Sequence, residues 1–178
     1  PTTALYWADL ADAYGKLATN AGLFAQLGWA RKCRAALEKA IALAPEDLEY
    51  RRGLAEYYEK APGIAGGGRD KALAQAAEIA RRDAYAGAQL TGGIQFRARN
   101  WAEAETAFLA AATLRPDAAE PIAALGLLYT DQGRHAEAFA QFDRLLARPP
   151  DAFAALYPLG RGAAGSGPRL ADGAAALH

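Results

Sequence analysis

The sequence predicts an all-α fold built from repeated pairs of helices, and three observations support this prediction. Pro116 and Pro150 lie 34 residues apart and close two successive units. Apolar residues between them recur at helical spacing, as in Ala138, Phe142 and Leu145 at positions i, i+4 and i+7. Alanine, the residue with the highest helix propensity, makes up roughly a quarter of the chain.

A tryptophan, leucine, small-residue and tyrosine motif recurs along the chain. The spacing W-x2-L-[AG]-x2-Y runs from Trp7 to Tyr14, and its second half returns from Leu125 to Tyr129. On these residues the chain resembles the tetratricopeptide repeat (TPR) family. The resemblance implies a right-handed superhelical solenoid of antiparallel helix pairs with about four to five repeats. Members of this family mostly bind other proteins and do no chemistry themselves.

Repeat boundaries follow from this period. A single domain 1–178 is expected, with repeats at residues 4–47, 48–84, 85–118 and 119–152 and a partial repeat at 153–178. The first repeat is about ten residues longer than the period and the second about five. We place the extra residues at 19–28 and 61–68, between the helices of each repeat, so stacking brings both insertions to the same edge. Residues 22–30 form either an extra turn packed on the first repeat or an exposed apolar edge.

Two repeats depart from the pattern. Gly92 and Gly93 fall inside the first helix of the third repeat, where each costs about 1 kcal/mol relative to alanine. We therefore expect residues 86–98 to form a loosely held helix whose backbone lies close to a neighbour or a ligand. Pro158 interrupts the fifth repeat, which ends without a polar cap. This end indicates a shortened chain, a further tail, or a second chain that covers it, which would make the protein a homo-oligomer.

Composition limits the classes of partner. Twenty basic and twenty acidic residues give no net charge, and no lysine–arginine block occurs, so neither nucleic acid nor anionic membrane is an expected partner. No apolar stretch approaches the roughly 20 residues that cross a bilayer, so no membrane insertion is expected. The lone cysteine, Cys33, falls at a small core position, and Ser166 has no base nearby in the sequence. His135 and His178 lack further ligands at metal spacing, so we predict no enzyme, no cofactor and no metal.

The resemblance also implies where a partner binds, because in this family the first helix of each repeat lines a concave groove. The corresponding positions, taken as the peptide-binding residues, are Asp12, Lys16, Glu49, Arg52, Glu56, Gln89, Arg97, Leu127, Tyr157 and Arg161. Arginine recurs among them. We expect these arginines to contact the backbone carbonyls or carboxylates of an extended peptide.

The glycine-rich segment before the second helix of the second repeat has the ingredients of an anion site. Its candidate residues are Gly66, Gly67, Gly68, Arg69 and Lys71. Backbone amides at a helix start, with two cations nearby, suit a phosphate or carboxylate. The alternative interpretation is a flexible hairpin in which Asp70 caps the following helix.

The predicted function is a protein–protein interaction scaffold that binds a peptide or helix in the concave groove. Two alternatives stay open: a small-ligand or anion receptor at the glycine-rich loop, and an accessory subunit that self-associates through its incomplete C-terminal repeat. The loop after Ala61-Pro62-Gly63 also resembles a subgroup of proteobacterial TPR proteins with exported precursors. This resemblance favours a periplasmic or secreted location over the cytoplasm without fixing it.

Overall fold

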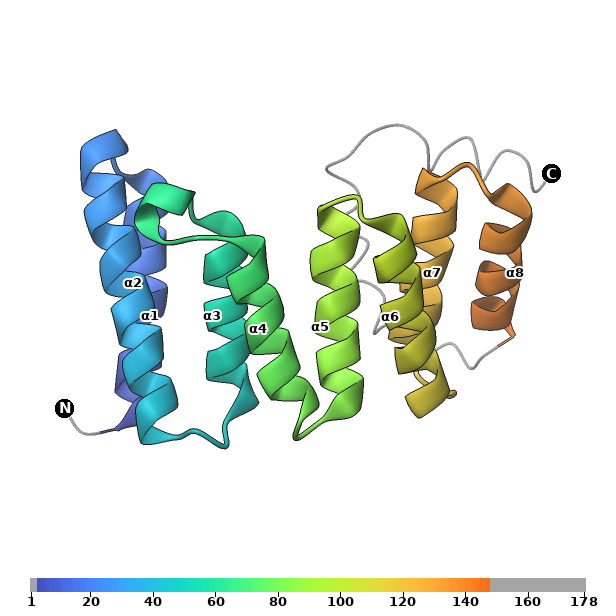
Figure 1. The fold of residues 1–178 in the computed structure, drawn as a ribbon, viewed down its shortest axis with the longest axis horizontal. Helices are drawn as coiled ribbons and strands as arrows, with labels where there is room; N and C mark the ends of the chain where they lie inside the picture. The colour runs from blue at the N-terminus through green and yellow to red at the C-terminus, as the bar shows by residue number, and fades with distance from the viewer. Residues whose placement is uncertain (1–2, 148–178) are drawn as a thin grey trace. The chain divides into compact units, whose positions relative to one another are not determined.

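The computed structural model describes residues 3–147, apart from the side chains of residues 23 and 24, and over this range it is all-helical without a strand (Figure 1). The elements in chain order are α1 (Ala4–Asn20), α2 (Leu23–Leu43), α3 (Leu48–Lys60), the 3-10 helix η1 (Gly63–Ala65), α4 (Arg69–Ala80), α5 (Ala84–Arg97), α6 (Trp101–Leu114), α7 (Ala119–Asp131) and α8 (His135–Leu146). The all-α prediction is confirmed. Tyr157, Arg161 and the predicted fifth repeat lie outside the described residues.

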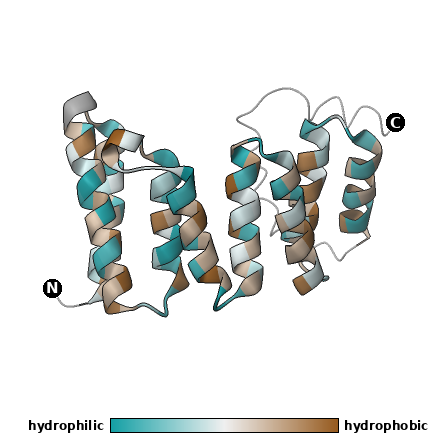
Figure 2. Ribbon diagram, in the orientation of Figure 1, coloured by the Kyte–Doolittle hydropathy of each residue, from teal (hydrophilic) through white to brown (hydrophobic). Residues whose placement is uncertain are grey.

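The chain divides into two compact units, Pro1–Leu114 and Arg115–His178. In the first unit α1 pairs with α2, α3 with α4 and α5 with α6, as three successive helix hairpins (Figure 1). Helix α2 also packs on α3, and α4 on α5, so the hairpins form one continuous array. Figure 2 shows hydrophobic and hydrophilic residues interleaved along these helices, as expected when one face of each helix is buried.

Aspartates begin two of the first helices. The side chain of Asp47 accepts a hydrogen bond from the Glu49 amide at 3.0 Å, and Asp83 accepts one from the Ala86 amide at 2.9 Å. Each caps an amide that has no partner within its helix. These caps fix where α3 and α5 start.

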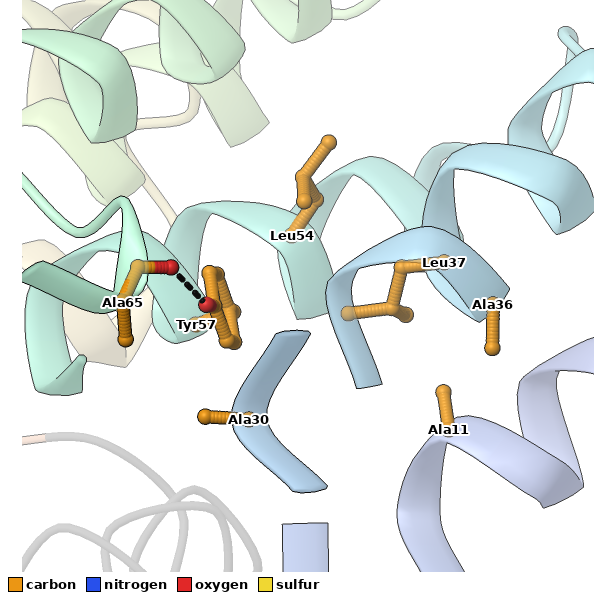
Figure 3. Close-up of a cluster of buried hydrophobic side chains, with 7 residues drawn as sticks. All are labelled: Ala11, Ala30, Ala36, Leu37, Leu54, Tyr57 and Ala65. Carbon is orange, nitrogen blue, oxygen red and sulfur yellow. Dashed lines mark hydrogen bonds between the residues drawn. The ribbon is translucent and has the colours of Figure 1, made fainter. Parts of the chain in front are cut away.

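The first hydrophobic core joins α1, α2, α3 and η1 (Figure 3). Its buried members are Ala11, Ala30, Ala36, Leu37, Leu54, Tyr57 and Ala65. Ala11, the small residue of the W-x2-L-[AG]-x2-Y motif, is 1% exposed, and both motif aromatics, Trp7 and Tyr14, pack against this core. The motif therefore supplies one small contact residue and two rings that close the core around it.

The predicted insertion at 19–28 is not a separate segment between short helices. Helix α1 continues to Asn20 and α2 begins at Leu23, so these helices are 17 and 21 residues long. The Trp29 ring stacks on Tyr14 with centroids 5.7 Å apart, and the Lys32 ammonium lies 4.4 Å from the Trp29 centroid. The expected packing of this segment on the first repeat is therefore confirmed for Trp29. Helix-favouring residues on both sides of a two-residue turn lengthen the helices instead of forming a loop.

The first helix of the third repeat is closely packed and not loosely held. Helix α5 is continuous from Ala84 to Arg97 and contains three buried residues, Gly87, Gly92 and Ile94. A Cβ atom at Gly92 would lie 2.5 Å from the Phe108 ring, and one at Gly87 would lie 2.4 Å from the Ala80 Cβ. The expected close approach of the backbone to a neighbour is thus confirmed. The glycines lower helix propensity, but they allow contacts that any side chain would block.

The second unit contains the α7–α8 hairpin. Its buried cluster comprises Ala119, Ile122, Ala123 and Leu145, with Phe142 packed against it. A Cβ atom at Gly126 would lie 2.6 Å from the Phe142 ring, and Gly133 turns the chain with a φ of 72°. The two glycines occupy the close-contact and turn positions that the repeat pattern predicts.

Replacing Gly92 by alanine is expected to destabilise the first unit by about 1–3 kcal/mol, because the added methyl group overpacks the Phe108 contact. Gly28→Ala on α2 is the matched control. Gly28 has no neighbour within 4 Å of the added carbon, so this change is expected to stabilise by about 0.5–1 kcal/mol. Urea denaturation followed by tryptophan fluorescence reports on the first unit, because all three tryptophans lie in it. Equal stability of the two variants would contradict the packing argument.

Candidate functional site

The predicted peptide-binding residues of the first unit lie on the first helix of each hairpin. We call them the first-helix face: Asp12 and Lys16 on α1, Glu49, Arg52 and Glu56 on α3, and Gln89 and Arg97 on α5. All are exposed except Gln89, which is half-buried. Leu127 is half-buried on α7 in the second unit. Tyr157 and Arg161 fall outside the described residues.

Two ion pairs form along α3, each between a basic and an acidic side chain about one turn apart. The Arg52 guanidinium lies 3.6 Å from the Glu49 carboxylate, and the Lys60 ammonium pairs with Glu56 one turn away. All four side chains are more than half exposed. Such pairs contribute little to stability, typically about 0.3–0.5 kcal/mol each.

A bidentate ion pair joins α5 to α3. Arg97 donates from Nε to Glu59 Oε1 at 3.0 Å and from Nη2 to Glu59 Oε2 at 2.7 Å. The Glu59 side chain is only 15% exposed, whereas Arg97 is 59% exposed. Sequence analysis missed Glu59. The available signal was its position 38 residues before Arg97, close to the length of the second repeat, which places the two residues at similar points on adjacent first helices.

Carboxylates on both α1 and α3 affect the pKa of the Cys33 thiol. The thiol lies on α2, half-buried beside the first core and not fully buried as expected. Burial raises its pKa, and the carboxylates of Asp12 and Glu56 raise it further because they oppose a thiolate. Two residues of the first-helix face, from different helices, therefore act on the same atom. The thiol stays protonated at neutral pH, which makes it a weak nucleophile.

The glycine-rich segment folds into a compact loop. Gly66 donates its amide to Gly63 O at 2.8 Å, Gly67 to Pro62 O at 3.2 Å, and Gly68 to Tyr58 O at 2.8 Å. Gly66 has a φ of 92°, and a Cβ atom at Gly67 would lie 1.8 Å from the Ala61 carbonyl oxygen. The three glycines are required by this backbone path. Their amides donate to nearby carbonyls. The groups that the loop could offer to an anion are therefore the side chains of Arg69 and Lys71.

The loop is anchored to the first hairpin. The Tyr57 hydroxyl donates to Ala65 O at 2.6 Å inside the first core (Figure 3). Arg31 on α2 donates to Ile64 O at 3.4 Å, and the Arg34 guanidinium fills the space beside Gly66. These contacts join the loop to α2 beyond residues 19–28, so the prediction that both insertions share an edge stays a prediction. The hairpin interpretation is wrong about the cap, since Gly68 precedes α4 and Asp70 lies in its first turn.

The described residues contain no group of three histidine, cysteine, aspartate or glutamate side chains that could hold a metal ion. Within the same range, every helix is too short or too polar to cross a bilayer.

The successive helix hairpins define a TPR-like helical-repeat fold. A crystal structure of the MamA protein has a similar fold, with a TM-score of 0.51 and 20% sequence identity over 79% of this chain and 69% of that chain. A second MamA structure, designated MSR-1 C2, gives a TM-score of 0.47 at 20% identity and covers 79% of this chain and 92% of that chain. No protein-family model matches the chain, and no curated protein matches it either. The likeness to MamA shows the fold class.

Tyr57→Phe is expected to destabilise the first unit by about 1–3 kcal/mol, because the buried carbonyl of Ala65 loses its donor. Amide hydrogen exchange in residues 65–68 should quicken at the same time. The control is Tyr58→Phe, which removes the neighbouring hydroxyl, a group whose pKa is raised by its burial and by Glu38. If both variants left loop exchange unchanged, the anchoring role of Tyr57 would be refuted.

Asp12→Asn and Glu56→Gln are each expected to lower the pKa of Cys33, since each removes a negative charge that opposes the thiolate. The rate of alkylation by iodoacetamide at about pH 8 should therefore rise in both variants. Asp9→Asn is the control on the exposed surface of α1. Because folding raises this pKa, the thiol contributes stability below its unfolded pKa, and that stability is lost as pH rises through the folded pKa. An unchanged alkylation rate in both variants would show that Asp12 and Glu56 do not raise the pKa of Cys33.

Proposed function

We propose that the protein is an interaction scaffold that binds a peptide or helix of a partner protein along the first-helix face. The observation that carries this proposal is the division of roles on α1, α3 and α5. Their small and apolar residues are buried in the packing between helices, while the residues at the predicted binding positions are mostly charged and solvent-exposed. The TPR-like fold supports the same class of activity, and we propose no enzymatic role.

Binding on this face would proceed by exchange of ion pairs. Arg52 and Arg97 already have carboxylate partners within the chain, Glu49 and Glu59. A partner's carboxylates or carbonyl oxygens would replace these acids, and its cations would then meet the released glutamates. Exposed pairs exchange at low cost, so this face would favour a partner with both signs of charge over a purely acidic one.

A second candidate function is an anion receptor at the glycine-rich loop. The observation that favours it is the pair of cations, Arg69 and Lys71, beside the start of α4. Lys71 donates to Gly66 O at 2.8 Å, and an anion would have to displace this contact. Self-association through the C-terminal repeat remains a prediction, because that repeat lies outside the described residues.

The scaffold proposal predicts that Arg52→Glu with Arg97→Glu abolishes capture of the partner from native extract, because both substitutions place like charges opposite Glu49 and Glu59. The control carries Lys39→Glu with Arg81→Glu, which makes the same change in net charge outside the first helices. Quantitative mass spectrometry compares the captured proteins. Partners retained by the wild type and the control but lost by the first variant are expected. If both variants recover the same proteins as the wild type, the first-helix face is not the binding surface.

A further inference from the structure

An apolar side chain protrudes from the anchored loop. Ile64 is 71% exposed at the centre of η1, the highest exposure among the large hydrophobic residues that the structure describes. The next residue, Ala65, is 1% exposed and belongs to the first core. A single exposed isoleucine is ordinary on a protein surface. Ile64 differs from an ordinary exposed side chain because hydrogen bonds hold the loop that carries it.

Backbone contacts on both sides of Ile64 hold it in place. Tyr57 binds the carbonyl of Ala65, and Gly66 closes the turn with its amide on Gly63 O. Gly67 cannot accept a side chain without striking Ala61. An apolar group fixed on a rigid loop loses little conformational entropy on binding, which is what a docking anchor needs.

Cationic side chains lie along the loop that carries Ile64. The side chains of Arg31 and Lys71 donate to the carbonyls of Ile64 and Gly66, at 3.4 and 2.8 Å, and Arg34 packs beside Gly66. Arg69 is exposed one residue after the glycines. The acids near these groups are Glu38, 3.5 Å from Arg34, and Asp70 in the first turn of α4. Among these named groups, four cations outnumber two carboxylates, so the loop carries an excess of positive charge.

We infer that this loop edge, defined as Ile64 with Arg31, Arg34, Arg69 and Lys71, is a second docking surface, separate from the first-helix face, for an acidic protein segment that carries an apolar side chain. The partner's apolar side chain would pack on Ile64, and its carboxylates would pair with the cations along the loop. Charge complementarity selects the sign of the partner. A lipid surface fits less well, because a single apolar side chain inserts little area into a bilayer.

The test is a subtractive selection from a phage library of random peptides of about twelve residues, the length of an extended or single-helix docking segment. Phage are first depleted on the full chain carrying Ile64→Asp and then selected on the wild-type chain. Ile64 is exposed, so the substituted chain is expected to fold, and tryptophan fluorescence checks this. Binding of the selected peptides is then measured by fluorescence anisotropy at low and at physiological salt.

The expected result is a set of peptides in which aspartate or glutamate flanks an aliphatic or aromatic residue. Their affinity should fall about tenfold or more with Ile64→Asp, as for an anchor residue, and weaken as salt rises. Leu109→Asp, at a residue 47% exposed on α6, and the Arg52→Glu, Arg97→Glu variant should both leave affinity unchanged. The second control separates this surface from the first-helix face, so either surface can fail without the other.

Three outcomes would overturn the inference. The first is that no peptide survives depletion, and the second is that the selected peptides carry no excess of acidic residues. The third is that vesicles containing phosphatidylserine bind the wild type but not the Ile64→Asp chain, which would assign the loop edge to a lipid surface.

Discussion

Close contact between helices at alanine and glycine positions is the constraint on which the described structure depends. Ala55, Ala72 and Ala76 are fully buried in a cluster shared by α3, α4 and α5. Gly92 admits the Phe108 ring where a methyl group would not fit. Because these contacts leave no spare volume, a larger side chain would push the helices apart. The abundance of alanine is therefore a packing requirement as well as a helix preference.

This apolar packing determines where the charges lie. Within the described residues, no polar or charged residue is buried, so the ionisable groups occupy the surface or its margins. Glu59, whose side chain is 15% exposed, is held there by a bidentate contact with Arg97. The stability of the fold thus comes from close packing of apolar side chains, and exposed charges contribute little to it. Charge on the first helices can consequently vary without loss of the apolar packing, as the proposed scaffold role would require.

The repeat pattern in the sequence predicted the fold class, and it predicted contacts that are set by position within a repeat. Gly126 against Phe142 and the turn at Gly133 follow directly from spacing. Contacts that depend on tertiary neighbours could not be read in this way. The amides of Gly66, Gly67 and Gly68 point inward because the carbonyls of Gly63, Pro62 and Tyr58 accept their hydrogen bonds, and no local sequence signal reveals this. The long helices α1 and α2 were missed because residues 19–28 contain glycines that resemble loop punctuation but do not interrupt α2 at Gly28.

Helix α3 serves both candidate surfaces, and this constrains how they relate. Glu56 belongs to the first-helix face, while Tyr57, the next residue, anchors the loop edge through Ala65. Successive residues on a helix point about 100° apart, so the two side chains leave α3 in different directions and do not compete for one partner. Tyr57 is also buried in the first core, so displacing the loop would disturb the packing between α2 and α3. If both proposals hold, occupancy of the fixed loop edge would leave the first-helix face in place, and the two surfaces would hold two protein segments at once.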